Sequence, residues 1–155
     1  MFAKRTPLMT VILVAGGLIL IGAMAPDSVV LRRRLMESNN STVAEALNKA
    51  IKEKNFAEIE GKCDVILENM DKVLDFFPLG SLSEDSRAKP EIWAKWGEFS
   101  KHPANVRKAA QELAVAAKAG DEESIKVKFK ALGAACKGCH DTFRAPKPKM
   151  GEEYR

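Results

Sequence analysis

The sequence has few residues of the types that build metal and catalytic centres. Its 155 residues include only two histidines, three cysteines and one tyrosine. Two cysteines and one histidine lie together near the C-terminus, and the remaining Cys63 and His102 do not form a second pair. A structural zinc site needs four ligands. The sequence therefore argues against a structural zinc site.

The sequence also lacks the residue combinations of common enzymes. It shows no evident carboxylate pair, no nucleophile next to a base, and one histidine besides the C-terminal one. General acid–base and nucleophilic catalysis depend on such partners. We therefore do not expect this protein to be an enzyme.

The sequence also lacks a large excess of positive charge. The 25 basic side chains are nearly balanced by 21 acidic ones, and two of the basic residues, Lys4 and Arg5, lie at the extreme N-terminus. Because nucleic-acid binding needs positive charge gathered on one surface, we expect no nucleic-acid partner. Aromatic residues make up only 6% of the chain, and its alanine- and lysine-rich composition favours helices.

The N-terminal segment, residues 1–25, has the layout of a secretory signal: a basic start, an uncharged apolar run and the ending Ala23-Met24-Ala25. Two details favour retention. Pro26 follows the best cleavage position, where it would obstruct cleavage, and the apolar run approaches the length of a membrane-spanning helix. We interpret this hydrophobic helix as a signal peptide or an uncleaved membrane anchor. The remaining chain is expected in the periplasm, either soluble after cleavage or anchored to the outer face of the inner membrane.

Apolar residues recur at three- and four-residue steps in four segments, which predicts amphipathic helices. These cover 27–53, with an irregular middle at Asn39-Asn40-Ser41, then 55–77, 103–119 and 122–142. Cys63 falls on the apolar side of the second segment, so we expect a core residue. The loop 79–101 contains Trp93, Trp96 and Phe99 and should fold back onto the other segments. The prediction is an all-α, antiparallel four-helix bundle in one domain, 26–145, followed by a flexible tail, 146–155.

The most specific motif in the sequence is Cys136-Lys137-Gly138-Cys139-His140. Two cysteines separated by two residues and followed by histidine form the attachment pattern of c-type haem. The thiols of Cys136 and Cys139 can add to the two haem vinyl groups, and His140 can supply the proximal iron ligand. A thioredoxin-like redox pair would need a βαβ context, which the helical pattern does not provide. Cys136 and His140 share the apolar side of the fourth helix, which predicts a haem inside the bundle.

Three segments resemble the cytochrome c′ family, the class II c-type cytochromes, over nearly all of residues 27–145. The segment 133–144 resembles the family's haem-binding end, and the late position of its motif is typical. The segment 88–93 resembles the loop before the third helix, and Arg32 with Met36 resembles a pair in the first helix.

The resemblance implies one covalently attached haem c, bound by Cys136 and Cys139, with His140 as the proximal ligand. Arg144 would lie near the proximal face. Arg32 would lie beside a haem propionate, or would be a solvated charge within Arg32-Arg33-Arg34. Met36 would lie over the distal face, as an iron ligand or a pocket residue, with a core methionine as the alternative and Leu35 as the neighbouring candidate. His102 is a less favoured ligand.

The sixth coordination position of the iron then decides between two functions. An open position would bind small gases such as NO and CO. Ligation by Met36 would make an electron carrier that serves redox partner proteins, since a Met/His pair raises the potential. A third hypothesis is a membrane-tethered haem subunit of a larger electron-transfer complex. By family resemblance, a homodimer would form through the first two helices.

Overall fold

The computed structural model describes residues 27–83 and 86–147. The expected signal or anchor segment and most of the expected tail lie outside these residues. The elements in chain order are α1 (Ser28–Ser41), the π-helical η1 (Thr42–Leu47), α2 (Asn48–Lys52), α3 (Phe56–Lys72), the 3₁₀-helical η2 (Val73–Phe76), α4 (Glu91–Ala94), α5 (Trp96–Phe99), α6 (His102–Lys118) and α7 (Glu122–Phe143). In the part of the chain described, no helix is long and apolar enough to cross a membrane.

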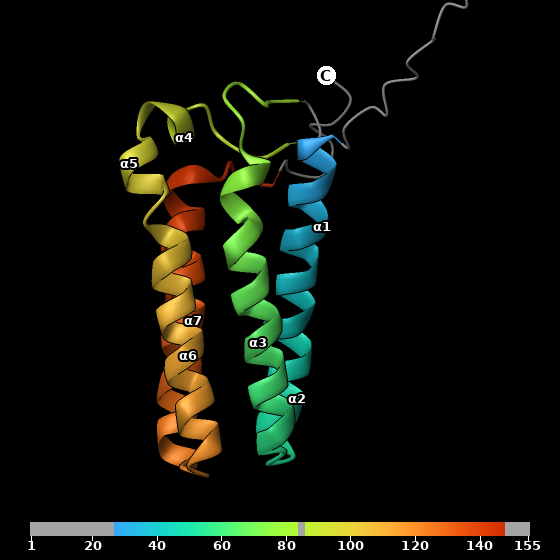
Figure 1. Ribbon diagram of the computed structural model, residues 1–155, viewed down its shortest axis with the longest axis vertical. Coiled ribbons are helices and arrows are strands. Elements are labelled where there is room, and N and C mark those ends of the chain that lie inside the picture. The colour runs from blue at the N-terminus through green and yellow to red at the C-terminus, as the bar shows by residue number, and fades with distance from the viewer. Residues whose placement is uncertain (1–26, 84–85, 148–155) are drawn as a thin grey trace, which may run out of the picture.

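Four long helical segments lie side by side and form the predicted bundle (Figure 1). The first segment is the continuous run of α1, η1 and α2, and the others are α3, α6 and α7. Helix α6 packs along both α3 and α7, whereas α1 contacts α3 and η2. The structure therefore confirms the all-α four-helix fold predicted from the apolar periodicity.

Short, well-capped turns produce the antiparallel pairs at the lower end of the bundle in Figure 1. Gly120 has a φ of 67°, a left-handed conformation that ends α6 without steric cost. Asp121 then caps α7, because its side chain accepts a hydrogen bond of 3.0 Å from the Ser124 backbone N–H. Asn55 caps α3 in the same way through Glu58. Each turn thus brings two helices alongside each other.

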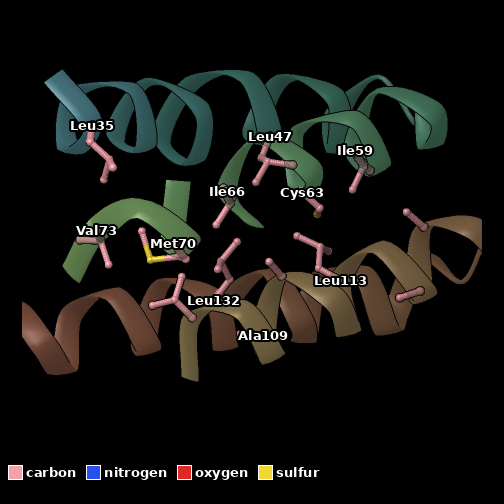
Figure 2. Close-up of a cluster of buried hydrophobic side chains, with 14 of the residues drawn as sticks. Leu35, Leu47, Ile59, Cys63, Ile66, Met70, Val73, Ala109, Leu113 and Leu132 are labelled. Carbon is pink, nitrogen blue, oxygen red and sulfur yellow. The ribbon is translucent and has the colours of Figure 1, made fainter. Parts of the chain in front are cut away.

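The bundle encloses one apolar core to which all four segments contribute (Figure 2). Its fully buried members include Leu47, Ile59, Ile66, Leu113 and Leu132. Cys63 is 0% exposed and lies among them, as the sequence pattern predicts. Burial, reinforced by the charges of Asp64 and Glu60, raises the pKa of the Cys63 thiol to about 12. Cys63 therefore packs as a small neutral core residue.

Two segments are more ordered than the sequence pattern suggests. The irregular middle of the first helix does not break the helix, because η1 continues the helical path with π-type hydrogen bonding. The loop expected over 79–101 contains α4 and α5. Trp93 anchors this segment by donating hydrogen bonds of 3.1 Å to the carbonyls of Phe77 and Pro78. This confirms that the aromatic part of the loop folds back onto the bundle.

Candidate haem-binding site

The Cys-x-x-Cys-His motif lies in the last turns of α7. Cys136 and His140 are four residues apart on this helix and therefore lie on one face, one turn apart. Both cysteines and His140 are half-buried. They line a cavity of about 440 Å³ between α1, α3, α6 and α7. Its walls also include the apolar residues Ile66, Met70, Val73, Phe99, Pro103 and Val106.

The opposite wall of this cavity comes from α1 and the start of η1. Met36, Asn39, Asn40 and Val43 recur at helical spacing and all line it. The fold thus brings Met36 to the same cavity as His140, although about a hundred residues separate them in the sequence. Leu35, the neighbouring candidate, is 7% exposed and belongs to the apolar core. The packing favours Met36 as the distal residue.

A second cavity, of about 530 Å³, adjoins the first and shares Met36, Asn40, Phe99, Cys139, His140 and Arg144 with it. Its other walls carry Arg32, Arg33, Arg87 and Lys147. Cavities of this size are typical of small-molecule and cofactor sites, which range over roughly 300–1,000 Å³. An apolar cavity beside a basic one suits a porphyrin, which has an apolar ring and carboxylate side chains.

The protonation chemistry of the motif also fits haem attachment. Burial raises the pKa of the Cys136 thiol, and burial together with the Cys136 charge raises that of Cys139 to about 11. Such thiols stay protonated at neutral pH, unlike the reactive thiolates of redox pairs. Conversion to neutral thioethers suits this buried position. Within residues 27–83 and 86–147, no group of three or more His, Cys, Asp or Glu residues could hold a metal ion.

The surroundings of His140 favour the neutral imidazole. Burial lowers the pKa of His140, and the charges of Arg144 and Arg87 lower it further, against the opposing effect of Asp141. Neutral imidazole is the form that ligates a metal. The residues present therefore fit a c-type haem, with His140 as the axial ligand on the α7 side.

Arg32 is buried rather than solvated, since it is only 4% exposed. Its guanidinium donates to the Ser81 hydroxyl at 2.9 Å, the Ser81 carbonyl at 2.5 Å and the Ser86 hydroxyl at 2.6 Å. It also lies 4.9 Å from the centre of the Phe77 ring. Burial lowers the pKa of Arg32, and the charge of Asp27 opposes that shift. The side chain thus ties α1 to the segment after η2, at the edge of the second cavity.

Arg144 directly follows α7 and is exposed at the junction of the two cavities. An antiparallel bridge pairs it with Ala88, and the Lys89 N–H donates to the Phe143 carbonyl at 3.0 Å. The segment that resembles the family loop is therefore held against the haem motif. The predicted roles of Arg32 and Arg144 toward a haem stay predictions, but both residues lie around the same cavity.

Sequence reasoning missed several residues that line these cavities. His102, which the sequence predicted only as a less favoured ligand, is half-buried, lines the first cavity and lies 5.6 Å, ring to ring, from Phe143. Asn39 and Asn40 were read only as an irregularity, although their spacing from Met36 places them on the same helical face. Arg87 lines the second cavity. It directly precedes the segment 88–93 that resembles the family, and this position could have identified it as a candidate.

Comparison with known proteins agrees with this geometry. Residues 27–144 match the family model described as Cytochrome C'. Cytochrome c' of Pararhodospirillum photometricum is 37% identical over 89 residues, which cover 57% of this chain and 71% of that protein. Cytochrome c-554 of Cereibacter sphaeroides is 37% identical over 93 residues, which cover 57% of this chain and 60% of that protein.

Solved structures show the same fold. A nitric oxide complex of a cytochrome c prime variant from Alcaligenes xylosoxidans superposes with a TM-score of 0.69 at 26% identity, covering 78% of this chain and 95% of that one. Cytochrome c prime from Shewanella frigidimarina gives the same TM-score and identity. Members of this family carry one covalently attached haem c, which agrees with the predicted cofactor. The four-helix fold, the position of the Cys-x-x-Cys-His motif and the match over residues 27–144 together show that the chain belongs to the cytochrome c′ family.

Proposed function

We propose that this protein is a periplasmic haem c protein that transfers single electrons, with His140 and Met36 as the two axial ligands. The observation that carries the proposal is that Met36 lines the same cavity as His140, on the opposite helix. When bound, the haem supplies the one-electron redox couple. A Met/His ligand pair raises the potential and suits electron exchange. Relatives named cytochrome c-554 and cytochrome c-556 occur among the matches.

The chain's own residues hold and shield the cofactor in this proposal. Cys136 and Cys139 would hold the porphyrin to α7 by thioether bonds, and His140 would supply an iron ligand from the same helix. Apolar side chains from η2 and α6, such as Val73 and Val106, would exclude water from the ring faces. Arg32 would lie beside a haem carboxylate, and Arg144 would lie near the proximal face of the haem.

Gas binding is the second candidate function. Solved relatives from Alcaligenes xylosoxidans are complexes with nitric oxide and carbon monoxide. In this chain, a Met36 side chain that packs in the cavity without ligating would leave the sixth position open to NO or CO. Asn39 and Asn40, about one helical turn from Met36, line the cavity that such a ligand would enter.

Absorption spectra of the ferric and ferrous protein, with and without carbon monoxide, separate the two functions. The electron carrier should be low-spin and should ignore carbon monoxide. Met36→Leu, which removes the sulfur and keeps the volume, should then become high-spin and bind carbon monoxide. Met70→Leu is the matched control, because Met70 lines the same cavity from α3. If the wild-type ferrous protein binds carbon monoxide readily, the result supports gas binding and contradicts the electron carrier.

The membrane-tethered subunit is the alternative to a free carrier. Mass spectrometry of the mature protein would test it, because retention of residues 1–25 supports an anchor and their loss removes the main argument.

We also propose a homodimer through the first two helices. Val30 and Val65 support it, since they are exposed on α1 and α3 with 40% and 37% of their surface accessible. Sedimentation analysis would measure the mass.

A further inference from the structure

Positive charge gathers around the second cavity, beside the haem motif. Among the described residues that line it, five are basic, namely Arg32, Arg33, Arg87, Arg144 and Lys147, and one is acidic, Glu37. The five cations exceed the carboxylate by four charges. The two carboxylates of a haem would offset two of these, so an excess of positive charge remains.

Backbone pairing holds part of this charge together. The bridge between Ala88 and Arg144 joins two segments of the chain, and it brings Arg87 and Arg144 to the wall of the same cavity. Arg87 donates to the Ala145 carbonyl, with its Nε at 2.9 Å. The charge of Arg144, together with burial, lowers the pKa of Arg87. Like charges are thus held near each other at some cost, which an anionic partner would relieve.

Acidic side chains neutralise other basic residues instead. The ion pairs in residues 27–83 and 86–147 are Lys54–Glu122, Arg107–Asp71, Lys126–Glu123, Lys128–Glu112 and Lys137–Asp141. None of them includes a basic residue of the second cavity. Arg33, Arg144 and Lys147 are exposed, and we call these three the basic rim. Arg32 is buried and belongs to the inner wall.

We infer that the basic rim is the docking surface for an acidic redox partner protein. The rim surrounds a cavity that contains Cys139 and His140, so a partner bound there would lie next to the attached haem. Opposite charge on the partner would steer the encounter and raise the association rate. The inference rests on the proposed one-electron function and adds the chemistry of the partner.

Electron transfer to small oxidants of opposite charge tests the inference. The ferrous holoprotein is mixed with the anion hexacyanoferrate(III) or with the cation tris(phenanthroline)cobalt(III), each of which takes one electron and leaves ferric haem. Arg33→Gln combined with Lys147→Gln should slow the reaction with the anion by about three- to tenfold at low ionic strength, and should speed the reaction with the cation.

The matched control removes two charges at the opposite end of the bundle. Lys52→Gln combined with Lys118→Gln changes the net charge equally, and both residues are exposed at the ends of α2 and α6. These variants should leave both rates within twofold of the wild type. Reduced flavodoxin, an acidic one-electron donor, should reproduce the pattern of the anion when it reduces the ferric protein.

Three results would overturn the inference. Equal effects of the rim and control variants would show that only net charge matters. Rates that are fast but unchanged in both the rim variant and the control variant would contradict a docking role of the basic rim. Slow rates with every reagent would instead contradict the electron-transfer function. The protein could also cosediment with phosphatidylglycerol vesicles. If only the rim variants lost this binding, and the rate of reduction by flavodoxin did not change, the rim would be assigned to a membrane surface.

Discussion

The two walls of the haem cavity are built in different ways. On one side, α7 is a regular helix of 22 residues that begins at the Asp121 cap and carries the complete attachment motif. On the other side, α1 is a helix of 14 residues that passes into the π-helical η1. The α7 wall depends on residues adjacent in the sequence, whereas the α1 wall reaches the site only by packing. In the proposed function, the α7 wall attaches the cofactor and the α1 wall adjusts its chemistry.

Polar contacts hold the α1 wall in its irregular region. The Asn69 amide donates to Asn39 Oδ1 at 2.9 Å and to the Ser38 hydroxyl at 3.3 Å, which joins α3 to α1 just before η1. Single-turn π segments occur frequently at functional sites. In this chain the segment follows directly after the cavity-lining residues Met36, Asn39 and Asn40, so the change of hydrogen bonding coincides with the distal wall.

The largest expected effect comes from removing the attachment chemistry of α7. Cys136→Ala combined with Cys139→Ala should abolish covalent haem binding, because no thiol remains to form a thioether. Mass spectrometry of the denatured protein would show the mass of the chain alone. Cys63→Ala is the matched control and should retain the haem, since Cys63 lies in the core away from both cavities. Covalent haem in the double variant would contradict the assignment.

The second effect concerns the stability of the α1 wall. Arg32→Ala should lower the free energy of unfolding by about 2–3 kcal/mol, because it removes a buried side chain and leaves half-buried acceptors on Ser81 and Ser86 without their donor. Arg33→Ala, one position later and exposed, should change it by less than about 0.5 kcal/mol. Chemical denaturation of both variants would measure the difference. Equal losses would show that the buried hydrogen bonds do not distinguish the two arginines.

The third effect measures the link between α1 and α3. In a double-mutant cycle, Asn39→Ala and Asn69→Ala should show a coupling energy of about 0.5–1.5 kcal/mol, the usual value of one hydrogen bond. The same variants should also shift the haem spectrum if this contact positions Met36. Additive effects on the free energy of unfolding, together with an unchanged haem spectrum, would show that the amide contact does not position the distal wall.

The smallest effect concerns the start of α7, far from the motif. Hydrogen bonds from the Ser124 hydroxyl and backbone lower the pKa of Asp121 below its ordinary value of 3.8. A lowered pKa stabilises the fold above the unfolded-state pKa, and this stabilisation is lost as the pH falls through the folded-state pKa. Asp121→Asn keeps a capping oxygen without the charge. Its melting temperature should therefore fall below that of the wild type at pH 7, and the difference should shrink as the pH falls below 3.8 and through the folded-state pKa of Asp121.

Much of the fold could be predicted because its signals are local. Apolar spacing located the four helical segments, and Gly120 with Asp121 marked the turn between α6 and α7. The pattern predicted one helix over 27–53 with an irregular middle, but it did not indicate that Thr42–Leu47 would adopt π-type hydrogen bonding. It also missed α4 and α5, whose few residues are ordered by the contact of Trp93 with Phe77 and Pro78.

The sequence by itself determined the attachment chemistry that we expect. Cys136, Cys139 and His140 are close together in the sequence, so that forming one helix is enough to bring them together. Only the tertiary structure decided what faces them. Helix packing places Met36 rather than Leu35 in the cavity, buries Arg32 and brings Arg87 beside Arg144. These contacts depend on how whole helices and loops fit together, and that fit is a property of the complete core rather than of any one segment.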